Sequence, residues 1–183
     1  MGTSLGIVVP EASLDRDEHG VRPSGDGWYV LNVRDARWFT SELDTYTVLE
    51  PEDPRFDMVG VGVGVLQAGR ANGMYHGEDA QEDFLVLSGE CLLLIEGEER
   101  RLKAWDFVHC PPWAEHIFVG VGDEPCVVLG VGARRKGRGI VYPRNETALR
   151  HDAGVEETTS DPREAYARFA EDSPVSGKDV FPL

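Results

Sequence analysis

Four side chains of metal-binding types stand close together in the middle of the sequence: His76, Glu78 and Glu82, then His116 one predicted hairpin later. Alternate residues of an extended strand face the same side, so the first three share a face wherever the backbone between them is extended. Imidazole nitrogens combined with carboxylate oxygens suit Fe(II), Mn(II), Zn(II) and Ni(II). We therefore predict a site for one divalent metal ion (Fe, Mn, Zn or Ni) formed by these four residues.

The predicted ligands also have simpler interpretations. The histidines could hydrogen-bond to buried groups without holding a metal. Glu82 enters an apolar strand, where a carboxylate must be paired, and an arginine such as Arg70 could be its partner. Glu78 lies in an acidic loop beside Asp79, where it could be a solvated surface carboxylate. If Glu78 binds, the site has two histidines and two carboxylates.

Residues beside the predicted ligands are candidates for a surrounding pocket: Tyr75, Gln81, His109 and Phe118. Tyr75 could donate a proton to a bound oxygen, and Gln81 could hydrogen-bond to a ligand or face water. Strand alternation allows only one of His109 and Cys110 to face the cavity. We expect His109 to orient a ligand or substrate, and Cys110 to pack as a buried thiol. Phe118 is equally compatible with the apolar core.

Composition limits the classes of function. The 183 residues suit a single domain that can bury its own core. A formal net charge of -15 repels nucleic acid and anionic lipid, so we expect neither as a partner. The sequence has no apolar run long enough to span a bilayer and no signal-peptide pattern. Three cysteines without close spacing suit reduced thiols, and we therefore expect a cytoplasmic protein.

Short apolar stretches separated by turn-forming residues dominate the middle of the chain. This spacing, with almost no helical periodicity, predicts an all-β sandwich or barrel. The stretch 92–95 is apolar on both faces, which indicates a strand in the centre of a sheet. Glycines alternate with valines in 58–67, which predicts a strand whose glycine face lies against something close or bulky. We expect strands at 29–33, 46–49, 58–67, 84–87, 91–95, 99–102, 107–110, 117–121 and 126–131.

The two ends of the chain differ from this middle region. The N-terminal residues are mostly polar and charged, which predicts an arm laid over the core or over a neighbouring subunit. Asp161 followed by Pro162 and Glu164 is typical of a helix start and predicts a short helix over 163–170. We therefore divide the chain into an arm (1–26), a barrel (27–145, with its motif-bearing core at 58–131) and a tail (146–183).

The ligand region resembles the first motif of the cupin superfamily, whose members are small jelly-roll β-barrels that usually hold a metal. Glu82 and Gly89 stand at the family's spacing, and His76 fills the first histidine position. Glu78 then stands where the second histidine is expected. Alternatively, His76 fills the second position and the loop carries an extra residue.

The second cupin motif is matched by Pro111 and His116, which supply the turn and the ligand. Trp105 and Trp113 replace the two glycines of the motif, and Gly120 replaces its asparagine. The resemblance implies an all-β cupin jelly-roll barrel, with the N-terminal arm and the short C-terminal helix added to it. Together with the arm, it also implies a homodimer.

The resemblance implies a metal-binding cupin, and we expect a metal-dependent enzyme that acts on a small polar organic molecule. Dioxygenase, isomerase and decarboxylase chemistry all suit such a site. The alternative is a non-catalytic cupin that binds or senses a small ligand, with a structural metal or none. A closed cage of four protein ligands would favour that alternative, whereas an exchangeable position would favour an enzyme.

Overall fold

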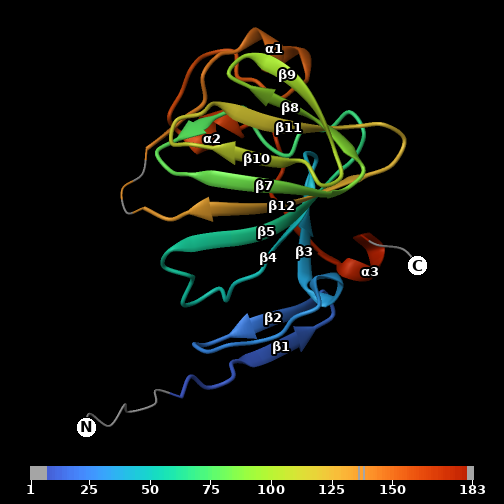
Figure 1. Ribbon diagram of the computed structural model, residues 1–183, viewed down its shortest axis with the longest axis vertical. Coiled ribbons are helices and arrows are strands. Elements are labelled where there is room, and N and C mark those ends of the chain that lie inside the picture. Colours follow the sequence, from blue (N-terminus) through green and yellow to red (C-terminus); the bar gives the residue numbers. More distant parts are fainter. Residues whose placement is uncertain (1–7, 136, 138, 181–183) are drawn as a thin grey trace.

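The computed structural model describes residues 8–135, 137 and 139–180, which form an all-β protein with two antiparallel sheets facing each other (Figure 1). The predicted jelly-roll barrel is confirmed. The larger sheet contains the glycine-rich strand and the strand that begins with Glu82. In spatial order, its strands are β10 (Phe107–Cys110), β7 (Glu82–Ser88), β12 (Cys126–Ala133), β5 (Val59–Leu66), β4 (Thr45–Val48), β3 (Arg37–Thr40) and β14 (Ser173–Ser176).

The smaller sheet lies across from β7 and β10. As its apolar sequence predicts, β8 (Glu90–Ile95) occupies the centre of this sheet. A short ladder between β13 (Ile140–Val141) and β6 (Gly77–Glu78) continues it, because His76 just before β6 pairs with His116. The main strands of the smaller sheet are, in spatial order, β11 (His116–Val121), β8 (Glu90–Ile95) and β9 (Glu98–Lys103).

The core fills the space between the two sheets. Side chains from both sheets contribute to it, and all three cysteines are free thiols buried there. This agrees with the prediction of reduced cysteines and gives the barrel a packed interior that reaches the predicted ligands through Cys110 and Phe118. The buried members of this core are Leu66, Val86, Cys91, Leu93, Val108, Cys110, Phe118, Cys126 and Val128.

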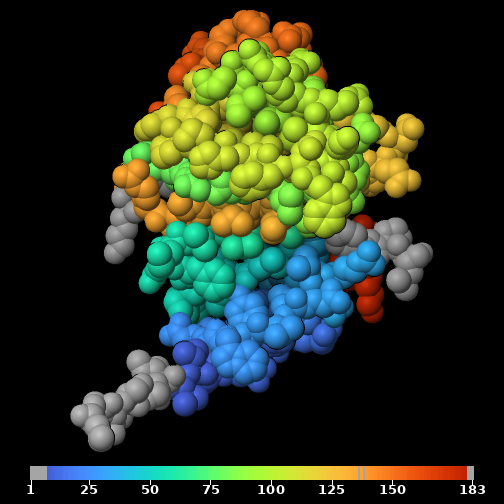
Figure 2. Space-filling model, in the orientation of Figure 1, coloured from blue at the N-terminus to red at the C-terminus, as the bar shows by residue number. Residues whose placement is uncertain are grey.

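Segments from the two ends of the chain cover the outer faces of the barrel. Helix α1 (Glu146–Arg150) packs its buried Ala148 against the outer side of the smaller sheet. Trp38 on β3 is fully buried on the outer side of the larger sheet. Figure 2 shows the same order in space-filling form, with the C-terminal orange segments at one end and the blue N-terminal strands at the other. Among the described residues, no helix is long and apolar enough to cross a membrane.

The ends of the chain are more ordered than the sequence indicated. Residues 1–7 of the predicted arm lie outside the described residues, but a hairpin of β1 (Ser13–Asp17) and β2 (Gly20–Ser24) follows them. All five residues of β1 are exposed, so this strand of the hairpin has no alternating burial pattern, whereas Val21 and Pro23 of β2 are buried. The C-terminal tail supplies the edge strand β14 and the short helix α3 (Gly177–Val180).

Two local predictions need correction. The expected strand at 29–33 is wrong: the side chain of Asn32 accepts a hydrogen bond from the backbone nitrogen of Arg34 and caps a 3₁₀ turn over Val33–Asp35. The helix expected over 163–170 begins as predicted, with Asp161 as its cap. Helix α2 extends only over Pro162–Ala165, however, and the chain then continues in turns.

The glycine face of β5 lies against the neighbouring strand, as expected. A Cβ atom added to Gly62 would lie 2.9 Å from the backbone carbonyl oxygen of Thr47 on β4. At Gly64, two residues further along the same strand, the nearest atom to an added Cβ is a carboxylate oxygen of Asp44 at 4.0 Å. Close packing therefore requires glycine at Gly62 but not at Gly64, although both lie on the same face of β5.

We predict that Gly62→Ala lowers the free energy of unfolding by about 1–3 kcal/mol, because β4 must move to admit the methyl group. The matched Gly64→Ala should change this free energy by less than about 1 kcal/mol. Urea denaturation of the two variants measures the difference. Equal losses of stability would show that β4 and β5 do not approach as described.

Candidate metal centre

The two candidate histidines are held opposite each other by their backbones. The amide of His116 donates to the carbonyl oxygen of His76 at 2.8 Å, and the amide of His76 donates to the carbonyl oxygen of His116 at 3.2 Å. Residues paired in this way on antiparallel strands project their side chains to the same side. The centroids of the two imidazole rings consequently lie 5.2 Å apart.

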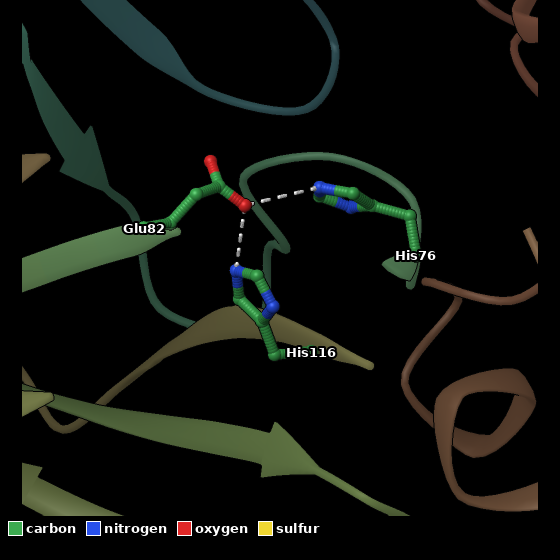
Figure 3. A group of neighbouring side chains, drawn as sticks. All are labelled: His76, Glu82 and His116. Carbon is green, nitrogen blue, oxygen red and sulfur yellow. Dashed lines mark ion pairs between the residues drawn. The ribbon is translucent and has the colours of Figure 1, made fainter. Parts of the chain in front are cut away.

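Glu82 approaches the histidines from the opposite sheet, as the first residue of β7. Its Oε2 atom lies 3.5 Å from Nε2 of His116 and 3.9 Å from Nε2 of His76. Figure 3 shows the carboxylate between the two rings, with each side chain coming from a different element. One potential ligand atom from each of the three residues lies within 4.8 Å of the others. The sheet register has thus gathered three predicted ligands across both sheets.

Backbone carbonyl groups orient both imidazoles. Nδ1 of His76 lies 2.8 Å from the carbonyl oxygen of Met74, and Nδ1 of His116 lies 2.9 Å from that of Ala114. A carbonyl oxygen can only accept, so Nδ1 carries the proton in each ring and Nε2 presents its lone pair toward Glu82. This arrangement is common for histidines that bind metals through Nε2.

Burial keeps His116 neutral. The residue is only 2% exposed, and burial, with a smaller contribution from His76, lowers the pKa of His116 to about 4. A neutral imidazole is the form that binds a metal ion. At neutral pH the site therefore need not release a proton from His116 before it binds a metal.

Aromatic side chains surround the histidines. The ring centroid of Phe84 lies 5.3 Å from that of His116, and Phe118 packs against Phe84 at 4.8 Å. On the other side, the ring of Tyr142 lies 5.9 Å from that of His76 and is buried. Tyr142 is not among the residues predicted from the sequence, because it follows the second motif and no nearby pattern marks it.

Glycines on β12 leave space next to the carboxylate. Gly132 pairs with Glu82 across the strands, and Gly130 pairs with Phe84. A Cβ atom added to Gly132 would lie 3.5 Å from Oε1 of Glu82, and one added to Gly130 would lie 3.3 Å from the Phe84 ring. A Cβ atom at Gly130 would press on the ring that supports His116, whereas one at Gly132 would meet the carboxylate at an ordinary contact distance.

The three gathered residues fit a divalent metal ion. Ligand atoms that share one ion at about 2.0–2.2 Å lie roughly 3.0–3.6 Å from one another, close to the separations of Glu82 from the histidines. Glu78 is buried on β6 but is not in the group whose ligand atoms converge. Glu82 lies against the histidines, whereas Arg70, proposed as its alternative partner, is exposed. The geometry thus brings together three of the four predicted ligands.

The four predicted pocket residues are placed differently from one another. Phe118 lies behind the site, against Phe84. Tyr75 is buried on the outer side of the smaller sheet, where its hydroxyl accepts from the amide of Gly97 at 3.1 Å. Alternation explains this, since His76 next to it faces inward. Gln81 is exposed and donates to a carboxylate oxygen of Asp83 at 2.6 Å. Tyr75 and Gln81 therefore lie away from the ligand atoms.

The expected pocket role of His109 also needs correction. Cys110 pairs with Glu82 and faces the interior, so its neighbour His109 faces outward. There Nδ1 of His109 lies 2.7 Å from Asp83, and the histidine lowers the pKa of that carboxyl group. The expectation that Cys110 is a buried thiol is confirmed, and burial raises the pKa of its thiol to about 12.

Two tryptophans adopt the backbone conformation that usually favours glycine. Trp105 and Trp113 have φ values of 75° and 72°, and these are the positions where the second cupin motif has glycine. The amide of Trp113 donates to the carbonyl oxygen of Glu78 at 2.8 Å and ties the loop before His116 to β6. The turns of the motif are therefore present although their usual residue is absent.

The comparisons with known proteins agree with this structure. Residues 62–132 match the family profile of the cupin domain, and they include all three gathered residues. No curated protein matches the sequence significantly.

Several solved structures resemble the chain. The polyketide cyclase RemF from Streptomyces resistomycificus is 17% identical, covering 54% of this chain and 70% of that chain with a TM-score of 0.47. The DMSP lyase DddQ from Ruegeria pomeroyi DSS-3 is 26% identical, covering 57% and 55% with a TM-score of 0.48. A cupin-like protein from Thermotoga maritima msb8 is 23% identical, covering 51% and 70% with a TM-score of 0.45.

The family assignment rests on the matched segment, because its residues form the barrel strands and carry the three converging side chains. Residues 62–132 therefore match the cupin domain, and this segment carries the three converging side chains.

Proposed function

We propose that this cupin is a metal-dependent enzyme that acts on a small polar organic molecule, with His76, Glu82 and His116 as the metal ligands. The observation that carries the proposal is the convergence of two oriented Nε2 atoms and one carboxylate oxygen. Three protein ligands leave coordination positions open, which is typical of catalytic rather than structural sites.

The residues around the ligands support this role in distinct ways. The carbonyl groups of Met74 and Ala114 keep both imidazoles in the binding tautomer. The rings of Phe84 and Tyr142 lie beside the two imidazoles, and Gly132 places no side chain next to Glu82. A bound divalent metal would supply Lewis-acid chemistry or, if it is iron, redox chemistry. Dioxygenase, isomerase and decarboxylase reactions are all compatible with this set of residues.

The alternative, a non-catalytic cupin that binds or senses a small ligand, requires a closed or empty site. The group of three converging side chains, without Glu78, favours the open site and hence the enzyme. Binding by Glu78 stays a prediction from the sequence, as do the cytoplasmic location and the homodimer.

We predict that protein purified without a histidine tag contains nearly one equivalent of Fe, Mn, Zn or Ni. His116→Ala and Glu82→Gln should reduce the metal content at least about tenfold, because each removes one of three ligands. Glu78→Gln should keep the metal if the site has only three protein ligands. Inductively coupled plasma mass spectrometry measures the content of each variant.

His109→Ala is the matched control for these variants, because it removes an imidazole that lies outside the site. It should retain the metal content of the wild type. Wild-type protein that is free of metal and cannot be reconstituted would contradict the enzyme proposal. Equal losses in His109→Ala and His116→Ala would contradict the assignment of the ligands.

The neutral state of His116 predicts how the stability of the metal-free protein depends on pH. Below pH 6.5 the unfolded chain takes up a proton at this residue, whereas the folded protein does not until about pH 4. The folded state therefore loses stability as pH falls through this window, by about 2 kcal/mol between pH 7.5 and pH 5. His116→Gln should remove this part of the loss, whereas His109→Gln should retain it. Urea denaturation after chelation tests this, and identical pH profiles for both variants would contradict it.

A further inference from the structure

A cavity of about 650 Å³ lies apart from the metal centre, and none of the three candidate ligands lines it. It is bounded by the loop into β4, by the turn at Asn72 and Gly73, and by the C-terminal segment after α2. Its volume falls in the range of sites for small organic molecules. The residues that line it are Ser41, Leu43, Asp44, Tyr46, Asn72, Gly73, Tyr166, Phe169, Ala170, Glu171 and Asp172.

The cavity carries negative charge, and no arginine, lysine or histidine is among the described residues that line it. Asp44, Glu171 and Asp172 line it, and none of them forms an ion pair within the described part of the chain. The nearest arginine in sequence, Arg168, is not a lining residue: it donates to the carbonyl oxygen of Asp152 at 2.5 Å and lies over the ring of Phe169, 4.8 Å from its centroid. Burial, and then repulsion by Asp172, raises the pKa of Asp44 to about 7. A cation in the cavity would offset the repulsion between these carboxylates and favour the charged form of Asp44.

Aromatic rings form much of the remaining wall. Tyr46 donates its hydroxyl hydrogen to a carboxylate oxygen of Asp172 at 2.6 Å, so this ring and this carboxylate are held together. The Tyr166 hydroxyl accepts from the amide of Met74 at 3.1 Å, and its ring lies 6.3 Å from that of Phe169. Tyr46 also stacks on Phe39, with ring centroids 5.6 Å apart, so the rings that line the cavity are held in place as its walls. Acidic groups alone would suit either a metal ion or an organic cation. The aromatic side chains in the wall favour an organic cation.

We propose that this cavity binds a small organic cation, namely an amine or quaternary ammonium compound with an apolar body. Carboxylates and aromatic faces both attract such cations. A hydrated divalent ion fits less well, because it prefers six or more oxygen ligands and gains little from rings. The proposal is independent of the metal centre, since the cavity and the candidate ligands share no residue.

Isothermal titration calorimetry with choline and with its uncharged isostere, 3,3-dimethyl-1-butanol, tests the proposal. We expect choline to bind at least about tenfold more tightly than the isostere. Asp44→Asn should weaken choline binding by about tenfold, because it removes a carboxylate while conserving shape. Glu42→Gln is the matched control: it removes an exposed carboxylate two residues away that does not line the cavity, and it should bind choline like the wild type.

Two further measurements distinguish cation binding in this cavity from binding at the metal centre and from an acidic calcium site. His116→Ala should bind choline with the affinity of the wild type. The result for the cation site is therefore independent of the result for the metal centre. Equal affinity for choline and its isostere, or unchanged choline binding in Asp44→Asn, would overturn the proposal. The absence of choline binding would also overturn the proposal. If calcium chloride binds instead of choline, and Asp44→Asn loses calcium binding, the cavity is an acidic metal site and the proposal is wrong.

Discussion

The reciprocal backbone pairing of His76 with His116 is the constraint on which the site depends. It joins the segment before β6 to β11 and fixes which side chains face the interior. Tyr75 and Ile117, the neighbours of the two histidines, are buried together on the outer side of the sheet. A slip of one residue would exchange Tyr75 with His76 and place an imidazole among apolar side chains. Apolar burial on the outside of the barrel therefore holds the histidines on the inside.

Much of the fold could be predicted from the sequence, because turn-forming residues punctuate short apolar strands from 46 to 131. The proximity of His76, Glu82 and His116 could be predicted as well, because the spacing of two motifs constrains it. Which of His109 and Cys110 faces the interior could not be predicted, because alternation alone allows either. The pairing of Cys110 with Glu82 decides it. Strands β1 and β14 escaped prediction because they are mostly exposed and have no alternating pattern.

Three buried or partly buried carboxylates, Glu50, Glu82 and Asp44, differ in their surroundings. Glu50, almost wholly buried, pairs with Arg134 and accepts from the amide of Phe56. Glu82 lies between two histidines, and Asp44 faces a cavity with no cation among the described residues. Burying a carboxylate costs free energy unless it is paired or bound. Arg134 pairs with Glu50, and the other two carboxylates are the ones for which we propose ligands.

The cavity and the metal centre are built on the same segments although they share no residue. The side chain of Asn72 accepts from the amide of Phe118, two residues after His116. The Tyr166 hydroxyl accepts from the amide of Met74, two residues before His76. The C-terminal segment therefore completes the cavity and also supports the backbone that orients one of the histidines.

Anomalous X-ray diffraction from crystals of the metal-loaded protein, collected at the absorption edge of the metal found in solution, is the most direct test of the proposed metal centre. We expect one strong anomalous peak about 2.0–2.3 Å from Nε2 of His76, Nε2 of His116 and a carboxylate oxygen of Glu82. If the crystals contain the metal but no anomalous peak lies between these three atoms, or if the peak lies elsewhere in the molecule, the assignment is wrong.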